Sequence, residues 1–361
     1  INNSKKPLIL VGQGVLLSNA EKELIQFSEK SGIPMASTLL GLSAISCHHK
    51  NYVGYLGMHG NYGPNVKTNE ADLLIAIGMR FDDRVTGDTS NYGINAKIIH
   101  IEIDPSEINK IIKTDVAVNA DAKQALINLL PFINKNEYKN WMNEFKKCDE
   151  IEFNKIIKKE LNHKSKKIKM TEVIHLISEM TNGKSIIVTD VGQHQMIASR
   201  YYKFTKPKSN ITSGGLGTMG FALPASMGAK LGQPKREVIA IIGDGGIQMT
   251  IQELATISQY NIGVKIIILN NNFLGMVRQW QELFFENRYS FTEMKNPDFP
   301  KIAEGYGIKN NKVENKSKLK KSIKELLDYK NAYLLEIVVE KEENVFPMVA
   351  SGDSVSNIRL E

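Results

Sequence analysis

The chain has 361 residues, a formal net charge of +7 and 42% hydrophobic residues, so it predicts more than one domain with sizeable cores. Only two cysteines are present, Cys47 and Cys148, which excludes a disulfide framework and fits a reducing compartment. No apolar run approaches the ~20 residues of a membrane span, and the start of the chain is not typical of a signal peptide. The lysines are spread without an arginine-rich patch, so the positive charge does not indicate nucleic-acid binding.

Strands and helices alternate over the first part of the chain, which predicts a parallel, doubly wound α/β sheet in a domain over residues 1–133. The expected elements are strands over 7–11, 72–79, 97–103 and 115–118, an extended piece over 33–36, and helices over 19–31, from Asp104-Pro105 and over 121–133.

Two features of this domain have more than one interpretation. Gly12 and Gly14 follow the first strand like half of a dinucleotide fingerprint, but the third glycine is missing, so a tight turn is as good an interpretation as a ligand loop. Glu102 ends a strand, where it would suit a ribose hydroxyl or would simply be a solvated acidic residue.

A polar, lysine-rich stretch over 134–169 is interpreted as a linker. Trp141 and Phe145 lie four residues apart within it, which predicts a helix docked on a surface rather than disorder. A second domain is expected over 170–343, followed by an irregular tail over 344–361.

The second domain also alternates strands and helices, so a second doubly wound parallel sheet is expected. Its predicted elements are a helix entered at Thr171, strands over 186–189 and 332–339, and helices over 222–232, 300–306 and 317–327.

The centre of this domain is a strand–helix–strand unit. An apolar strand over 238–242 stops at a Gly-Asp-Gly-Gly turn, helical spacing follows over 247–257, and a second apolar strand over 264–269 ends at three asparagines. Such crossovers give parallel neighbours, so Asp244 and Asn271 are predicted at the carboxyl ends of strands in one sheet, where open α/β sheets bind ligands.

The chemistry of these side chains indicates metal-bound phosphate. Carboxylate and amide oxygens suit Mg²⁺, which usually takes further ligands from phosphates, carbonyls and water. The glycines around Asp244 leave room for a diphosphate close to the backbone, and a helix N-terminus would face the anion.

Gly243-Asp244-Gly245 followed by Asn270-Asn271 resembles the fingerprint of thiamine-diphosphate enzymes. The resemblance implies that Asp244 and Asn271 bind Mg²⁺ through their side chains and that Phe273 does so through its backbone carbonyl. Many relatives carry a different residue in place of Phe273, a change that a backbone role tolerates.

Over nearly its whole length the chain resembles the catalytic subunits of acetolactate synthases. The motifs are TDVGQHQM, GGLGTMGFALP, GDGG, LNNNFLGMVRQWQE and VFPMVASG in the later part, and ASTLLGL, YLGMHG, GMRFDDRVTG and HIEIDPSEI in the earlier part. Related pyruvate oxidases and decarboxylases share the fold but are not similar at RFDDRVTG and GMVRQWQ. The resemblance therefore implies a flavin-binding middle domain and a thiamine-diphosphate-binding domain.

The resemblance also implies the site residues. Those expected around thiamine diphosphate are Gln193, His194, Gly217, Met219, Asp244, Gly245, Gly246, Asn271, Leu274, Gly275 and Met276. Those expected around FAD, which would be structural, are Gly12, Thr38, Leu39, Gly57, Met58, His59, Arg80, Asp83, Arg84, Glu102, Ile103 and Asp121. Trp280 would shape the pocket for the second substrate. Without the resemblance, Met219 and Trp280 would be packing residues, and the two arginines would be ordinary surface residues.

The implied reaction is decarboxylation of pyruvate on thiamine diphosphate and transfer of the hydroxyethyl unit to a second pyruvate or 2-oxobutanoate, a step of branched-chain amino-acid biosynthesis. The implied partners are 2-oxo acids, a homodimer or larger assembly and a small regulatory subunit, with neither nucleic acid nor membrane. The expected location is the cytoplasm, or the plastid stroma for an organelle-encoded chain.

One feature of the family is expected to be missing from this chain. The glutamate that activates the cofactor belongs to an N-terminal domain, and no glutamate here matches its motif, so no catalytic residue is assigned. An alternative is therefore a cofactor-binding subunit or fragment that is inactive without a separate N-terminal domain. A related pyruvate oxidase or decarboxylase is the other alternative.

Overall fold

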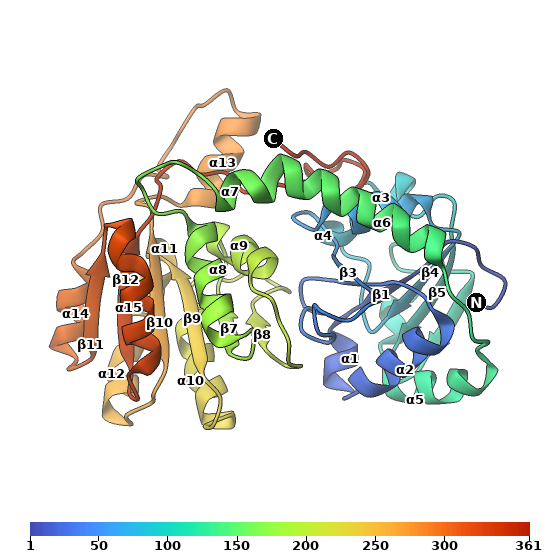
Figure 1. The fold of residues 1–361 in the computed structure, drawn as a ribbon, viewed down its shortest axis with the longest axis horizontal. Helices are drawn as coiled ribbons and strands as arrows, with labels where there is room; N and C mark the ends of the chain where they lie inside the picture. Colours follow the sequence, from blue (N-terminus) through green and yellow to red (C-terminus); the bar gives the residue numbers. More distant parts are fainter. The chain divides into compact units, whose positions relative to one another are not determined.

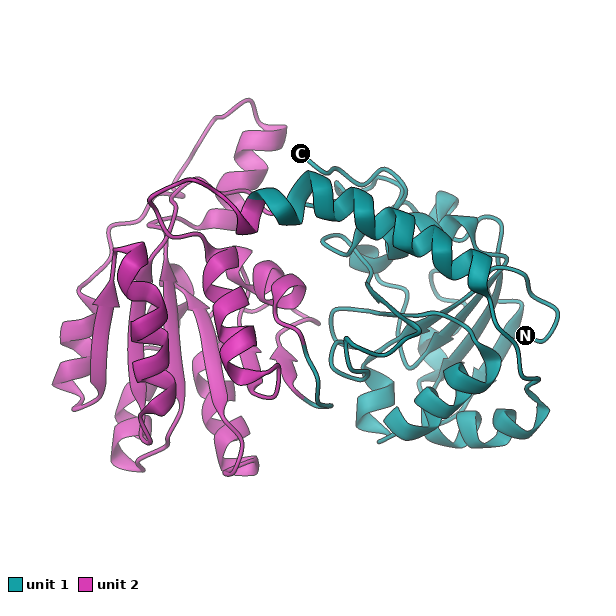
Figure 2. Cartoon of the chain, viewed as in Figure 1, with its two compact units in different colours: residues 1–159, 204–208, 346–361 teal, residues 160–203, 209–345 magenta.

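Two parallel six-stranded sheets, each covered by helices on both faces, form the core of the computed structural model, which describes residues 1–361. They belong to two units (Figure 2). Unit 1 comprises Ile1–Lys159, Phe204–Lys208 and Phe346–Glu361, and unit 2 comprises Glu160–Lys203 and Ser209–Val345. The predicted fold class, two doubly wound parallel sheets, is confirmed.

Unit 1 has the strand order β3-β2-β1-β4-β5-β6. Its strands are β1 (Pro7–Val11), β2 (Met35–Ser37), β3 (Tyr52–Tyr55), β4 (Leu73–Ile77), β5 (Lys97–Glu102) and β6 (Val116–Asn119). Its helices are α1 (Gln13–Leu17), α2 (Glu21–Ser31), α3 (Tyr62–Glu70), α4 (Asp83–Thr86), α5 (Ala122–Leu129) and α6 (Lys139–Glu152), which continues through a π-helical turn (Phe153–Ile157) into α7 (Lys158–Leu161).

Alternate residues of the unit 1 strands supply two cores, one on each face of the sheet. Ile9 and Ile75 belong to the core that also contains Phe27 of α2 and Leu126 of α5. Leu8, Leu74 and their neighbours form the other core with Trp141 of α6. Because both faces are covered, the central strands β1 and β4 are apolar throughout, as the sequence indicated.

Unit 2 has the strand order β11-β12-β10-β9-β7-β8 (Figure 1). Its strands are β7 (Ile186–Thr189), β8 (Asn210–Thr212), β9 (Val238–Gly243), β10 (Lys265–Asn270), β11 (Lys309–Val313) and β12 (Tyr333–Val338). Its helices are α8 (Met170–Thr181), α9 (Gln193–Tyr201), α10 (Ala222–Gly232), α11 (Asp244–Met249), α12 (Glu253–Gln259), α13 (Gly275–Phe284), α14 (Phe299–Gly305) and α15 (Lys316–Asp328).

Three details of the predicted elements are corrected. The helix expected from Asp104-Pro105 is a three-residue 3₁₀ turn, which the Asp104 carboxylate caps by accepting from Ser106 N at 2.9 Å. The helix expected over 247–257 is two helices, α11 and α12, separated by residues 250–252. Thr171 does not cap α8, because that helix begins at Met170 and its cap position is Lys169.

The bounds of the two units differ from the predicted domain bounds. Most of the stretch interpreted as a linker belongs to unit 1, as do the tail residues from Phe346 onward. The physical reason is burial, because Trp141 and Phe145 of α6 are only 2% and 1% exposed. The prediction that these two residues dock a helix on a surface is confirmed. None of the helices is both long and apolar enough to cross a membrane.

Trp141 anchors α6 on unit 1. Its indole Nε1 donates a hydrogen bond to the carbonyl of Pro7 at 2.8 Å, and its ring packs edge-on against Phe145 with centroids 5.0 Å apart. We expect Trp141→Ala to destabilise unit 1 by about 3–5 kcal/mol, because the substitution leaves a cavity and an unpaired carbonyl. Urea unfolding followed by far-ultraviolet circular dichroism would measure the change.

The matched control is Phe132→Ala, since Phe132 is another aromatic residue of unit 1 but is 76% exposed. It should change stability by less than about 0.5 kcal/mol. Equal effects of the two substitutions would contradict the anchoring role of Trp141.

Candidate functional site

The strand order of unit 2 contains a switch point between β7 and β9. The chain adds β8 on one side of β7 and then places β9 on its other side, so the loops after β7 and β9 diverge. Open α/β sheets bind ligands in the crevice at such a point, outside the carboxyl ends of the strands. Asp190 directly follows β7, and Asp244 directly follows the last residue of β9. Both carboxylates therefore lie at the edge where a ligand is expected.

Asp244 is a buried carboxylic acid at the first position of α11, with 1% of its surface exposed. Burial raises its pKa from the usual 3.8 to about 6, because a charge in a poorly solvated site is disfavoured. A hydrogen bond from Asn296 Nδ2 to Asp244 Oδ2, at 2.6 Å, acts in the opposite direction. Backbone hydrogen bonds from Asp244, Gly245 and Asn272 act in the same direction as Asn296, but burial is the larger effect, and a carboxylate in such a poorly solvated site is suited to a cation.

Asn296 joins several groups at this edge and was not predicted as a site residue. Its amide nitrogen lies 3.0 Å from Asn270 Oδ1 and 3.1 Å from Asn272 Oδ1, in addition to its contact with Asp244. Three oxygen atoms thus converge on one nitrogen. No local signal could have revealed this, because Asn296 stands before a proline in a segment that reads as an ordinary turn.

Asn271 contacts Gln193 and Phe273 rather than Asn296. Its Nδ2 donates to Gln193 Oε1 at 3.3 Å, and its Oδ1 accepts from the backbone nitrogen of Phe273 at 3.2 Å. The structure therefore brings together the predicted residues Asn271 and Gln193. Asp244 and Asn271 follow neighbouring strands, but no hydrogen bond joins them, and the ion that they would share stays a prediction.

Glycines let these side chains pack closely against the backbone. A Cβ atom added at Gly275 would lie 2.1 Å from Gln193 Oε1 and 2.8 Å from Asn271 Nδ2. One added at Gly245 would lie 2.8 Å from a methyl group of Leu274 and 3.3 Å from the terminal methyl of Met219. Any side chain at these two positions would displace predicted cofactor residues, so the arrangement is a close-fitting cradle.

Asp190 holds together two further segments that were predicted to bind the cofactor. Its Oδ1 lies 2.5 Å from His194 Nε2, and its Oδ2 accepts from Gly220 N at 2.9 Å. A Cβ atom at Gly246 would come within 2.0 Å of the same carboxylate. Asp190 was not among the predicted site residues, although it directly follows a strand, as Asp244 does.

The remaining predicted residues of unit 2 lie in loops and helix ends at the same edge. Gly217 has a left-handed φ of +65° in the exposed loop before α10, and Met276 is half-buried in the first turn of α13. Trp280 is half-buried on α13 with its ring 4.7 Å from that of Phe284. This contact fits the packing interpretation and leaves the substrate interpretation of Trp280 as a prediction.

The residues predicted to surround FAD gather at the carboxyl edge of the unit 1 sheet. They follow the ends of β1, β2, β3, β4, β5 and β6, and the strand order reverses between β1 and β4. The Arg80 and Arg84 side chains are 50% and 64% exposed, and Ile103 is 65% exposed. Exposed cations after β4, beside the switch point, and an exposed apolar residue after β5 suit a dinucleotide that lies across the strand ends.

Several of these residues also have structural contacts. A Cβ atom at Gly12 would lie 2.1 Å from the carbonyl of Gly78, so this glycine lets the loops after β1 and β4 approach each other. The Asp121 carboxylate caps α5 by accepting from Lys123 N at 2.9 Å, and Glu102 Oε1 accepts from Ile103 N at 2.9 Å. The close approach of the two loops agrees with the tight-turn interpretation of Gly12, and the ligand-loop interpretation stays a prediction. The other predicted positions are Thr38 and Leu39 after β2, Gly57, Met58 and His59 after β3, and Asp83 in α4.

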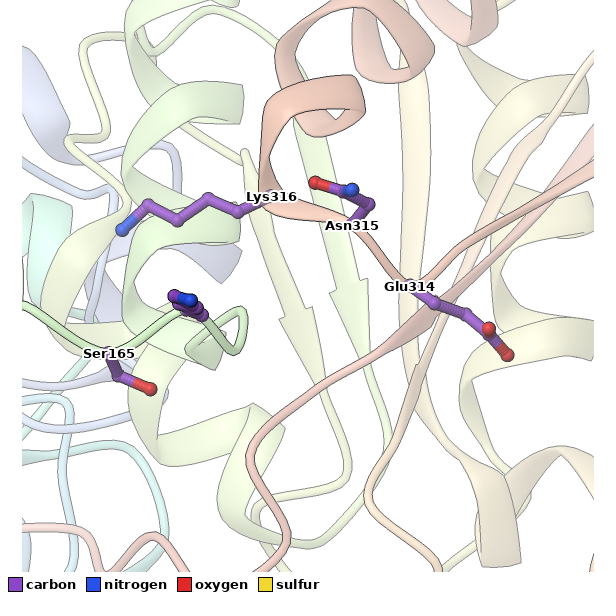
Figure 3. Close-up of a pocket in the computed structure, with 5 residues that line it drawn as sticks. Ser165, Glu314, Asn315 and Lys316 are labelled. Atoms are coloured by element: carbon purple, nitrogen blue, oxygen red, sulfur yellow. The ribbon is translucent and has the colours of Figure 1, made fainter.

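A separate surface pocket of unit 2 contains none of the predicted residues. It is lined by Ser165, Lys166, Glu314, Asn315 and Lys316, with the Glu314 carboxylate pointing away from Lys316 (Figure 3). It mixes charges of both signs and does not include a strand end at the switch point. The candidate site is therefore the carboxyl edge rather than this pocket.

Two protein families match the chain, one in each unit. Residues 1–129 match the central domain of thiamine pyrophosphate enzymes, and residues 190–337 match the C-terminal TPP-binding domain of thiamine pyrophosphate enzymes. The second match begins at Asp190 and contains every residue predicted to bind thiamine diphosphate or metal.

Similar proteins are found among bacteria and plants. The chain is 42% identical over 368 residues to an acetolactate synthase large subunit of Buchnera aphidicola from Schizaphis graminum, covering 99% of this chain and 63% of that protein. It is 44% identical over 352 residues to the corresponding protein of Lactococcus lactis, covering 97% of this chain and 60% of that protein. It is 42% identical over 371 residues to the chloroplastic acetolactate synthase 2 of Nicotiana tabacum, covering 100% of this chain and 55% of that protein. The chain thus spans 55–63% of the length of these relatives.

The raised pKa of Asp244 gives a testable dependence of stability on pH. Its carboxyl is neutral in the folded and unfolded states at low pH, whereas above a pH of about 6 the folded protein must bury a charge. The folded state therefore loses stability relative to the unfolded state as the pH rises from about 4 through about 6, because the Asp244 carboxyl ionises while buried. We expect Asp244→Asn to be more stable than the wild type at pH 8 by roughly 2–3 kcal/mol, with little difference at pH 4. Urea unfolding in metal-free buffer would measure this.

Asp298→Asn provides a control of opposite sign. Asp298 caps α14, and its hydrogen bond from Lys301 N lowers the pKa of its exposed carboxyl. That variant should lose stability relative to the wild type as the pH rises. A constant stability difference for Asp244→Asn at every pH would contradict the assigned cause.

Proposed function

We propose that this chain, which belongs to the thiamine pyrophosphate enzyme family and is homologous to acetolactate synthase large subunits, itself acts as an acetolactate synthase large subunit. The reaction would be decarboxylation of pyruvate followed by transfer of the two-carbon unit to a second 2-oxo acid. The observation that supports the proposal is the arrangement at the carboxyl edge of the unit 2 sheet, where Asn271 and Gln193 meet beside Gly275 and the buried Asp244 carboxylate follows the neighbouring strand β9.

The residues of unit 2 would hold Mg²⁺ and the diphosphate of thiamine diphosphate. Asp244 and Asn271 offer side-chain oxygens and Phe273 a backbone carbonyl, which is the hard-oxygen donor set that Mg²⁺ prefers. Asn271 Oδ1 would exchange its contact with Phe273 N for the ion. Thiamine diphosphate, when bound, supplies the electron sink that a 2-oxo acid needs for decarboxylation.

The other side chains would orient the cofactor and exclude water. Gln193 and His194 lie in the first turn of α9, whose amides face the carboxyl edge, and Asp190 fixes the His194 ring. Met219 and Leu274 enclose Gly245 with apolar groups, which suits the ring system of the cofactor more than its phosphates. Trp280 would line the pocket for the second 2-oxo acid and select between pyruvate and 2-oxobutanoate.

Unit 1 would bind FAD at the carboxyl edge of its sheet, with Arg80 and Arg84 near the phosphates. Both guanidinium groups are paired only with the neighbouring carboxylates of Asp82 and Asp83 at the surface, so they are accessible to an anion. We further propose a homodimer or larger assembly, a small regulatory subunit as a partner, and a cytoplasmic or plastid location. These proposals concern a whole protein, and this chain spans 55–63% of the length of the relatives.

Replacing Asn271 tests the metal-binding arrangement. We expect Asn271→Ala to weaken Mg²⁺-dependent binding of thiamine diphosphate by at least about tenfold, because it removes an ion ligand. Isothermal titration of the purified protein with the cofactor, at several Mg²⁺ concentrations, would measure the change. The control is Asn310→Ala on the edge strand β11, whose side chain bonds only the Ile308 carbonyl, and it should bind normally.

An activity assay tests the reaction itself. Purified protein with pyruvate, thiamine diphosphate and Mg²⁺ should form acetolactate, either alone or after addition of a separately produced N-terminal domain of a homologous enzyme. Product formation only after that addition would identify the chain as a cofactor-binding part. Reduction of bound flavin at the rate of product formation would instead indicate pyruvate oxidation and overturn the proposal.

Replacing the two exposed arginines tests flavin binding. We expect Arg80→Ala combined with Arg84→Ala to reduce the flavin retained by the purified protein at least about tenfold, since charge-assisted contacts with phosphate are lost. Flavin absorbance per protein chain would measure retention. Lys22→Ala, an exposed cation on α2, serves as a matched control and should retain flavin fully. Unchanged retention in the double variant would contradict the assignment of these arginines.

A further inference from the structure

Glu336 is a buried acidic residue in the middle of the apolar strand β12. It is 2% exposed, and its strand neighbours Leu335 and Ile337 are both completely buried. A carboxyl group in such a place costs free energy unless hydrogen bonds compensate. None of the cofactor residues predicted from the sequence lies on β12, so the function described so far does not account for Glu336.

The main partner of Glu336 is Asn270, the last residue of the adjacent strand β10. Asn270 Nδ2 donates to Glu336 Oε1 at 2.7 Å, and both residues are at least nine-tenths buried. The Lys312 ammonium lies 3.5 Å from the same oxygen, and Glu336 Oε2 has no hydrogen-bond partner. The contact with Asn270 is therefore the closest interaction of this buried carboxyl.

This contact determines which way the Asn270 amide faces. The NH₂ group of Asn270 donates to Glu336 Oε1, so the amide oxygen of Asn270 faces the opposite direction. That oxygen accepts from the backbone nitrogen of Asn272 and from Asn296 Nδ2, each at 3.0 Å. If the amide turned over, its NH₂ group would face two donors.

The next step in the network reaches Asp244. Asn296, oriented by Asn270 Oδ1, directs the same NH₂ group to Asp244 Oδ2 at 2.6 Å. Its own oxygen accepts from Gln248 Nε2 at 3.0 Å, and Gln248 also donates to the Asp244 carbonyl at 3.0 Å. A directed chain of hydrogen bonds thus runs from β12, through the end of β10, to the carboxylate at the end of β9.

We infer that Glu336 is a positioning residue for the cation site, which orients the Asp244 carboxylate through Asn270 and Asn296. This inference rests on the proposed function, because it presupposes that Asp244 binds the divalent cation of a bound diphosphate. Glu336 does not touch the ion or the substrate. Outer partners of metal ligands hold those ligands in the geometry that the ion requires, and their loss commonly weakens metal affinity by about 10–100-fold.

The test compares two substitutions in the purified protein. Glu336→Leu removes the acceptor and frees the Asn270 amide to turn, so the affinity for Mg²⁺ in the presence of thiamine diphosphate should fall at least about tenfold. Glu336→Gln keeps an oxygen that can accept from Asn270, so it should restore an affinity within about threefold of the wild type. Isothermal titration would measure both affinities, and urea unfolding would verify that each variant is folded.

A double-mutant cycle tests the route through Asn296. Asn296→Ala should weaken Mg²⁺ binding by itself, and adding Glu336→Leu to it should cause little further loss, because both act through one chain of contacts. Losses that multiply would show two independent effects and overturn the inference. Lys312→Met removes the ion pairs of Lys312 with Glu336 and Glu314 but keeps the Asn270 contact, so it should leave Mg²⁺ affinity unchanged, whereas a loss equal to that of Glu336→Leu would also overturn the inference.

The outcome separates this inference from the proposed function. If the wild-type protein does not bind Mg²⁺ with thiamine diphosphate, the proposed function fails, and the inference fails with it. If the wild type binds normally and a folded Glu336→Leu variant binds equally well, only the inference is wrong.

Discussion

The burial of the Asp244 carboxylate at the end of β9 is the constraint on which the unit 2 site depends. The strands of a parallel sheet covered on both faces are apolar, so polar chemistry is confined to the edge where the strands end. Asp244 is placed there by five buried apolar residues of β9 and by a helix that begins at the aspartate itself. Burial raises the pKa of Asp244, because a charge in this poorly solvated site is disfavoured.

The surrounding asparagines reduce this cost without removing it. Asn296 donates one short hydrogen bond to the carboxylate, and Asn270 and Asn272 direct further oxygens at the same amide. The oxygens of Asp244, Asn270 and Asn272 share the one Asn296 amide nitrogen, and a cation bound beside them would add the positive charge that such an oxygen-rich site suits. Sites that bind charged ligands commonly reduce stability in this way, because the ligand supplies the missing interactions.

The unit 1 sheet also has a switch point in its strand order, but the residues at its carboxyl edge are different. Its switch point lies between β1 and β4, where Gly12 and Gly78 approach so closely that no side chain fits between them. Arg80, Arg84 and Ile103 at the ends of β4 and β5 are exposed, whereas Thr38 and His59 at the same edge of the sheet are buried. A long ligand that lies across strand ends suits such an open edge, whereas the compact, buried site of unit 2 suits an ion and a diphosphate.

Much of this architecture follows from the sequence, because apolar runs that stop at glycine, aspartate or asparagine mark both the strands and their functional ends. The strands at 7–11, 186–189, 238–242 and 264–269, the placement of Asp244 and Asn271 after neighbouring strands, and the docking of Trp141 were all accessible to periodicity and residue chemistry. The short or polar elements β3, β8 and β11 were missed, since three to five residues without alternation give no periodic signal.

The strand order, and hence the switch points, was decided only by tertiary pairing. The same holds for the contacts of Asn296 and Glu336, because a hydrogen bond between residues 52 or 66 positions apart depends on how the strands are paired in space and leaves no pattern along the chain.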